Sequence, residues 1–212
     1  SSGKKLEPIE EVTIDIDEEH SSRIIDSMNR RKAQLVELKD TGKNKKRLIF
    51  YAPTRGLMGY TSRFLTLTKG TGVINRTFHS FGEYAGDLDG RRNGALVSME
   101  NGKAVAYAIF NLQDRGEFFI THNDPVYEGM IVGLGSKSGD LVVNVLKGKK
   151  LTNVRASGAD ENVVLTPVRN MSISEMLGML NTDEALEITP KSCRLRKAIL
   201  DPNERKRQAK AS

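Results

Sequence analysis

Apolar and polar positions alternate along the first eighty residues in a pattern that predicts six elements. Val12, Ile14 and Ile16 are separated by single polar residues, which is the period of a half-buried strand. Ile24 and Met28 lie one helical turn apart and predict a helix behind a cluster of acids. The remaining predicted elements are strands at 33–38, 47–52 and 73–81, a hairpin turn at 40–44 and a helix at 57–67. Their order is strand, helix, strand, strand, helix, strand.

This order is typical of a ferredoxin-like unit, in which both helices cover one face of an antiparallel sheet. We assign the unit to residues 1–84, because a stretch rich in glycine follows. Residues 85–212 form a second predicted domain. Its expected strands are 95–99, 118–121, 130–134, 141–146, 162–167, 185–189 and 193–199.

Two short helices interrupt this second domain, at 105–113 and 174–180. Ser172 and Glu175 are spaced as a capping box before the latter. Many short strands separated by turn residues favour a mostly-β, barrel-like domain. The predicted fold class of the whole chain is therefore α+β.

Positive charge is concentrated at the C-terminal end of the sequence. The 212 residues carry 33 Lys and Arg against 27 Asp and Glu, a net charge of +6. Eight bases and two acids lie in residues 191–212, so this segment accounts for the whole excess. A segregated basic surface favours a polyanion as partner, with nucleic acid first. The alternative is solvated charge ending in a disordered tail over 201–212.

Residue spacing in the sequence does not indicate a self-contained active site. His20, His79 and His122 are far apart and do not have the spacing of metal ligands. The single cysteine, Cys193, excludes an internal disulfide and is expected to be a buried structural thiol. The glycine-rich run 133–139 lacks the GxxxxGK[ST] spacing of a phosphate-binding loop, so we interpret it as a hairpin turn.

The segment 147–161 has no periodicity and few large apolar residues, which predicts a long exposed loop that becomes ordered on binding RNA. Lysine offers a point charge to phosphate, and arginine offers a bidentate fork. Few aromatic residues accompany them, which favours structured RNA recognised by shape and phosphate. The candidate RNA-binding residues are Lys147, Lys149, Lys150, Asn153, Arg155, Ser157, Arg194, Arg196 and Lys197.

Several short motifs resemble known proteins. Residues 7–12 (EPIEEV), 29–34 (NRRKAQ) and 55–60 (RGLMGY) are similar to the fifth domain of elongation factor G. The runs RRNGALVSMENGKAVAYAIFNLQDRGEFF, PVYEGMIVG and GKKLTNVRASGADE resemble the C-terminal domain of the TypA/BipA family of translational GTPases. Together these motifs extend over most of the chain.

The resemblance implies the C-terminal half of such a GTPase, without the GTPase domain. This chain is then not an enzyme and holds no cofactor or metal, because GTP and Mg²⁺ bind in the absent N-terminal domain. The implied partners are the ribosome, through large-subunit rRNA and the acceptor end of A-site tRNA, and the N-terminal domains of the same protein. The implied roles are ribosome assembly, translation, and adaptation to stress and low temperature.

The alternative is a protein-interaction module that docks other domains and makes no contact with RNA. No apolar stretch is long enough to cross a bilayer, and no signal-peptide pattern opens the sequence. We therefore expect a cytoplasmic monomer without a membrane partner, cut from a longer protein.

Overall fold

The computed structural model describes residues 5–88, 91, 93–148 and 164–211, which form two compact units. The first unit is Ser1–Gly90 with Ser172–Met179, and the second is Arg91–Met171 with Leu180–Ser212. Within the described residues, none of the helices has the length and apolar character needed to span a membrane.

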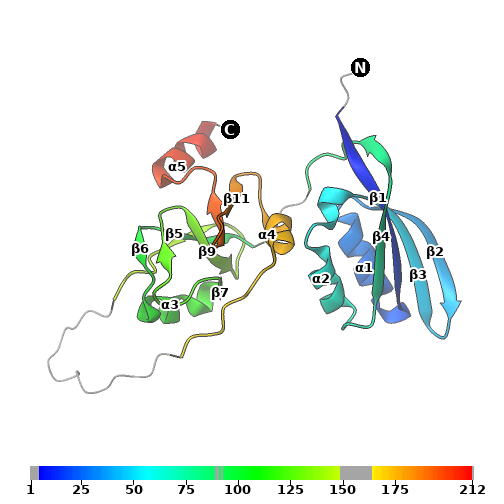
Figure 1. The fold of residues 1–212 in the computed structure, drawn as a ribbon, viewed down its shortest axis with the longest axis horizontal. Coiled ribbons are helices and arrows are strands. Elements are labelled where there is room, and N and C mark those ends of the chain that lie inside the picture. The colour runs from blue at the N-terminus through cyan, green and yellow to red at the C-terminus, as the bar shows by residue number, and fades with distance from the viewer. Residues whose placement is uncertain (1–4, 89–90, 92, 149–163, 212) are drawn as a thin grey trace. The chain divides into compact units, whose positions relative to one another are not determined.

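The first unit is built on a four-stranded antiparallel sheet with the order β2-β3-β1-β4. Two α-helices lie on one face of this sheet, each preceded by a short 3₁₀ turn (Figure 1). The element order confirms the predicted β-α-β-β-α-β unit. The bounds are β1 Leu6–Asp17, η1 Glu18–His20, α1 Ser21–Asn29, β2 Gln34–Gly42, β3 Lys45–Pro53, η2 Thr54–Leu57, α2 Tyr60–Leu67 and β4 Val73–Glu83.

The alternation along β1 places the core of this unit between sheet and helices. Val12, Ile14 and Ile16 are fully or almost fully buried against Met28 of α1 and Phe64 of α2. Burial of apolar side chains of this size contributes about 1.5–3 kcal/mol each. The apolar positions of the period-two pattern are therefore the ones on the face of the sheet that packs against the helices.

The β2–β3 hairpin turns more tightly than the sequence suggested. The ladder continues to Gly42 and resumes at Lys45, so only Lys43 and Asn44 form the loop. Both have positive φ, 52° and 59°, as a two-residue type I′ turn requires. This turn matches the twist of the flanking strands.

A helix from the second half of the sequence completes the first unit. Helix α4, Ile173–Met179, has the predicted capping box: Ser172 N–H donates to the Glu175 carboxylate (2.9 Å), and Glu175 N–H donates to Ser172 Oγ (3.2 Å). Gly59 N–H donates to Ser174 Oγ (3.1 Å). The sequence analysis placed this helix within 85–212, whereas the structure assigns it to the first unit.

The second unit contains a six-stranded mixed sheet with the order β10-β5-β9-β12-β11, in which β7 also pairs with β9. Together with its helices this confirms the α+β class. The bounds are β5 Ala95–Ser98, β6 Gly102–Lys103, α3 Ala106–Leu112, η3 Gln113–Arg115, β7 Gly116–Phe118, β8 Pro125–Val126, β9 Met130–Gly135, β10 Leu141–Val143, β11 Glu184–Ile188, β12 Cys193–Lys197 and α5 Pro202–Ala211.

Two local predictions in this unit are wrong. Residues 133–139 do not form a hairpin turn, because β9 and β10 each pair with β5, which lies between them. Residues 164–167 are not a strand, and the rest of the predicted strand at 162–167 lies outside the described residues. The alternative of a disordered tail over 201–212 does not hold either, because residues 202–211 form the helix α5.

We expect Gly178→Ala to displace α4 from the first unit. Alanine favours a helix over glycine by about 1 kcal/mol, but a Cβ at this position would lie 2.4 Å from the Met58 carbonyl oxygen. Overpacking of this kind costs about 1–3 kcal/mol, so thermal unfolding should show a lower Tm. Gly148→Ala is the matched control, since a Cβ there meets nothing within 4 Å. A similar gain in Tm for both variants would contradict the packing of α4.

Candidate nucleic-acid interface

The structure describes four of the nine candidate RNA-binding residues. Lys149, Lys150, Asn153, Arg155 and Ser157 lie outside the described residues. The other four are Lys147, Arg194, Arg196 and Lys197, all in the second unit.

Lys147 is exposed shortly after β10. No ion pair or hydrogen bond to its side chain is found among the residues that the structure describes. Its ammonium group is therefore available to an anion.

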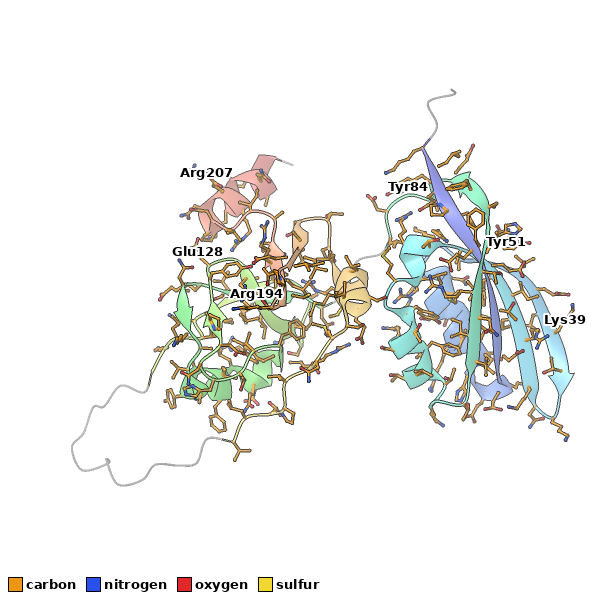
Figure 2. The ribbon with its side chains drawn as sticks, viewed as in Figure 1. Lys39, Tyr51, Tyr84, Glu128, Arg194 and Arg207 are labelled. Atoms are coloured by element: carbon orange, nitrogen blue, oxygen red, sulfur yellow. The ribbon has the colours of Figure 1, made fainter. Side chains whose placement is uncertain are left out.

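Strand β12 separates its charged residues between two environments. Leu195 and Lys197 are buried, at 3% and 2% exposure, whereas Arg194 and Arg196 alternate with them and are partly exposed. Figure 2 marks Arg194 on this strand. The period of two therefore gives the second unit one inward-facing cation and two outward-facing ones.

The two arginines have few partners of opposite charge. Arg194 Nη1 lies 3.5 Å from a Glu187 carboxylate oxygen. Arg196 Nη1 donates to the carbonyl oxygens of Lys197 (3.0 Å) and Ala198 (3.2 Å). Neither bond of Arg196 neutralises its charge, so its guanidinium can still attract phosphate.

Glu187 also accepts a hydrogen bond from the phenol of Tyr127, at 2.6 Å. Burial and this carboxylate raise the pKa of Tyr127 to about 12. The phenol therefore remains a neutral donor at physiological pH and occupies one oxygen of the acid that Arg194 approaches.

Lys197 does not belong in the RNA-binding set. Its Nζ is bonded to three carboxylates: Asp183 (2.8 Å), Glu184 (2.9 Å) and Asp140. Arg91 completes the cluster with two bonds of 2.6 Å to Glu184, whose side chain is fully buried. The alternation with buried Leu195 was the signal in the sequence that Lys197 points inward.

The electrostatics of this cluster favour its ionised form. Burial alone would lower the pKa of Lys197, but its hydrogen bonds to Asp140, Asp183 and Glu184 outweigh burial and raise it. Burial alone would raise the pKa of Asp140, but the bonds from Lys197 and the Ala95 amide lower it. The cluster is therefore a stabilising ionic centre, not a site for an external anion.

A surface cleft of about 420 Å³ adds two cations to the same unit. Arg115 and Lys137 line it beside Ser136, with Leu96 and Leu141 as apolar lining and Asp114 as its acid. The cleft combines hydrogen-bond donors with positive charge, which suits a phosphate group.

The other candidate chemical groups have local partners. His20 is buried 3.3 Å from Glu19, and the ring of His79 stacks on Tyr51 with 4.1 Å between centroids. Cys193 is half-buried rather than buried. Within the described part of the chain, no group of three or more His, Cys, Asp or Glu could hold a metal ion.

Comparison with known proteins finds one family match for each half of the sequence. Residues 4–92 match the family model of the elongation factor G C-terminus, and residues 93–202 match that of the TypA/BipA C-terminal domain. The chain belongs to the TypA/BipA family.

Curated relatives in this family align over nearly the whole chain. It is 49% identical to the large ribosomal subunit assembly factor BipA of Bacillus subtilis, over 98% of the chain and 34% of that protein. It is 46% identical to the Salmonella typhimurium factor of the same name, over 97% of the chain and 34% of that protein. The chain therefore spans about a third of the length of these TypA/BipA relatives.

We expect Lys197→Met to destabilise this TypA/BipA chain by about 1–3 kcal/mol. The buried Glu184 carboxylate loses one of its two cations and keeps only Arg91, and the partly exposed Asp140 loses its bond to the ammonium group. Chemical denaturation measures the difference in free energy of unfolding. Lys191→Met is the control, since Lys191 is exposed in the same basic segment. A Lys197→Met variant that is as stable as the control but binds RNA more weakly would contradict this assignment and show that Lys197 contacts RNA.

The same cluster predicts a stability plateau that is bounded on both sides of pH 7. The lowered pKa of Asp140 contributes stability above its unfolded value of about 3.9, which is lost as the pH falls through the folded pKa. The raised pKa of Lys197 contributes stability below about pH 10.4, which is lost as the pH rises through the folded pKa. Tm measured against pH should show both limbs. An alkaline limb that persists unchanged in Lys197→Met would contradict this assignment.

Proposed function

We propose that this chain is the ribosome-binding part of a longer translational GTPase, and that it contacts large-subunit rRNA and the acceptor end of A-site tRNA. The longer protein would bind GTP with Mg²⁺ outside this chain and act in large-subunit assembly, translation and stress adaptation. It would work in the cytoplasm as a monomer. The two curated relatives are named as large ribosomal subunit assembly factors.

One observation carries the proposal: the charge is divided along the chain. Residues 191–212 hold the entire net charge of +6, and the other 190 residues are neutral overall. Arg194 and Arg196 are partly exposed on β12, and Lys147 is exposed after β10. Cations distributed in this way position a protein on a phosphate backbone without reading its sequence.

A second candidate function is docking to other protein domains, and an apolar feature of the first unit favours it. Phe78 and Phe81 of β4 are 62% and 66% exposed, and their rings meet edge to face with centroids 5.5 Å apart. Leu6, opposite the end of β4, is also 58% exposed. Exposed apolar side chains on a sheet edge are typical of an interaction surface. The two functions can coexist, because the charge and the apolar patch lie on different units.

Salt dependence separates the two functions. We expect replacement of Lys149, Lys150 and Arg155 by alanine to weaken binding to purified large ribosomal subunits. Each lost phosphate contact should make the slope of log affinity against log salt shallower by about 0.7–0.9. The sequence predicts that these three residues are exposed, so folding should be nearly unchanged, because exposed substitutions usually fall within about 0.5 kcal/mol.

The control for this variant replaces Arg23, Lys43 and Lys103 by alanine, which removes the same charge at exposed positions elsewhere. An unchanged slope in the loop variant, together with a lowered Tm, would mean that the loop serves the fold. Phe78→Ser should instead weaken domain docking with little change in salt slope. If only that variant affects ribosome binding, the docking function is the correct one.

A further inference from the structure

Helix α5 does not bury an apolar face, although it is a well-formed element of the second unit. Its sequence is PNERKRQAKA, in which the only apolar side chains besides proline are two alanines. Pro202 and Arg205 are partly buried, and the residues between Asn203 and Lys210 are otherwise exposed. A helix that is polar all round, and this short, is marginal on its own in water. Its stability must come from its ends and from its attachment.

The first turn of α5 is capped by a side chain. Asp201 Oδ1 accepts hydrogen bonds from the amides of Asn203 (2.6 Å) and Glu204 (3.0 Å), and these bonds lower the pKa of Asp201. Pro202 occupies the first helical position, where its missing N–H costs nothing. Asp201 therefore holds two of the amides that a helix N-terminus leaves without partners.

The segment before α5 fastens the helix to the unit. Arg205 Nη1 donates to the carbonyl oxygens of Ile199 (3.0 Å) and Leu200. Leu200 packs so closely on Gly129 that a Cβ at 129 would lie 2.8 Å from Leu200 Cα. The Arg205 side chain is thus occupied in holding α5 to the segment before it, and that segment packs against Gly129 of the second unit.

The remaining cations of α5 form one stripe. Lys206 and Arg207 are adjacent, and each lies three or four residues from both Asn203 and Lys210, which places all four on one side of a helix. Figure 2 marks Arg207 on this helix. Among the described residues, none of the three cations has an ion pair or a side-chain hydrogen bond. Like charges at this spacing repel one another, and a bound anion would relieve the repulsion.

We propose that α5 is a preformed phosphate-binding helix, and that Lys206, Arg207 and Lys210 contact the backbone of an RNA. The inference rests on the proposed function, to which it adds an element outside the nine candidate residues. The helix lacks the large apolar side chains that would enter a membrane interface or a protein groove. Its unpaired donors match a polyanion instead.

The first test removes the charge and keeps the helix. Lys206, Arg207 and Lys210 are replaced together by glutamine, whose helix propensity is close to theirs. Binding of the complete chain to a fluorescein-labelled RNA hairpin is measured over a series of salt concentrations. The slope of log affinity against log salt should become shallower by about 2–3. A control with Arg23, Lys43 and Lys103 replaced by glutamine has the same net charge and should keep most of the slope.

The second test removes the helix cap and keeps the charge. Asp201→Asn and Asp201→Ala change the net charge equally, but only asparagine is a good N-cap. We expect Asp201→Ala to lose helical circular dichroism and to bind the RNA hairpin about two- to tenfold more weakly than Asp201→Asn. A charged tail without structural requirements would bind equally well in both variants, and that result would overturn a preformed helix.

The outcomes distinguish this inference from the proposed function. If the wild-type chain binds the hairpin and the glutamine variant of α5 behaves like its control, the role of α5 is refuted and the proposed function is not affected. If the wild-type chain binds neither the hairpin nor large ribosomal subunits, both are refuted. A shallower slope confined to the α5 variant, with helix content retained, supports the phosphate-binding helix.

Discussion

The second unit depends on the buried ammonium group of Lys197. The three carboxylates around it come from two places: Asp140 directly precedes β10, and the adjacent Asp183 and Glu184 lie at the start of β11. Arg91 brings the first residue of the unit to the same point, 93 positions from Glu184 in the sequence. Desolvating these charges is costly, and only the complete set of partners offsets that cost. Segments of little apolar content are thereby fixed at one centre, and β12 is held so that Arg194 and Arg196 face outward.

The first unit uses one ion pair for a similar purpose at its end. Arg55 of η2 bonds to the Glu7 carboxylate and to the Gly86 carbonyl, and its guanidinium lies 4.5 Å from the centre of the Tyr84 ring. The Ala85 amide also donates to Glu7 (2.8 Å). Residues beyond β4 are therefore tied back to β1. The glycine-rich composition after residue 82 suggested a linker, but glycine content says nothing about contacts that distant residues make.

The sequence predicted local structure well wherever one face of an element meets a core. The β1 pattern and the Ser172–Glu175 capping box could be found because their causes lie within a few residues. The packing of α4 on Met58 could not be found in this way, since it joins positions more than a hundred residues apart. Helix α5 was missed for a different reason. Asp201 before Pro202 is a helix start signal, but the sequence analysis considered only the charge of this segment and left a disordered tail as an alternative.

The candidate interface shows why a charge count indicates a partner but not its contacts. The eight bases of residues 191–212 look equivalent in the sequence, yet in the structure they have different bonding partners. Lys197 is neutralised inside the unit, and Arg205 is committed to carbonyl oxygens at the start of α5. What separates them from Lys206 or Arg207 is the presence of acceptors nearby: distant carboxylates for Lys197, and the carbonyl oxygens of Ile199 and Leu200 for Arg205. A basic residue is fully available to an external phosphate only when the fold gives it no such acceptors. Among the described residues of this segment, the strongest candidates for the interface are therefore the exposed cations that have no carboxylate or carbonyl partner.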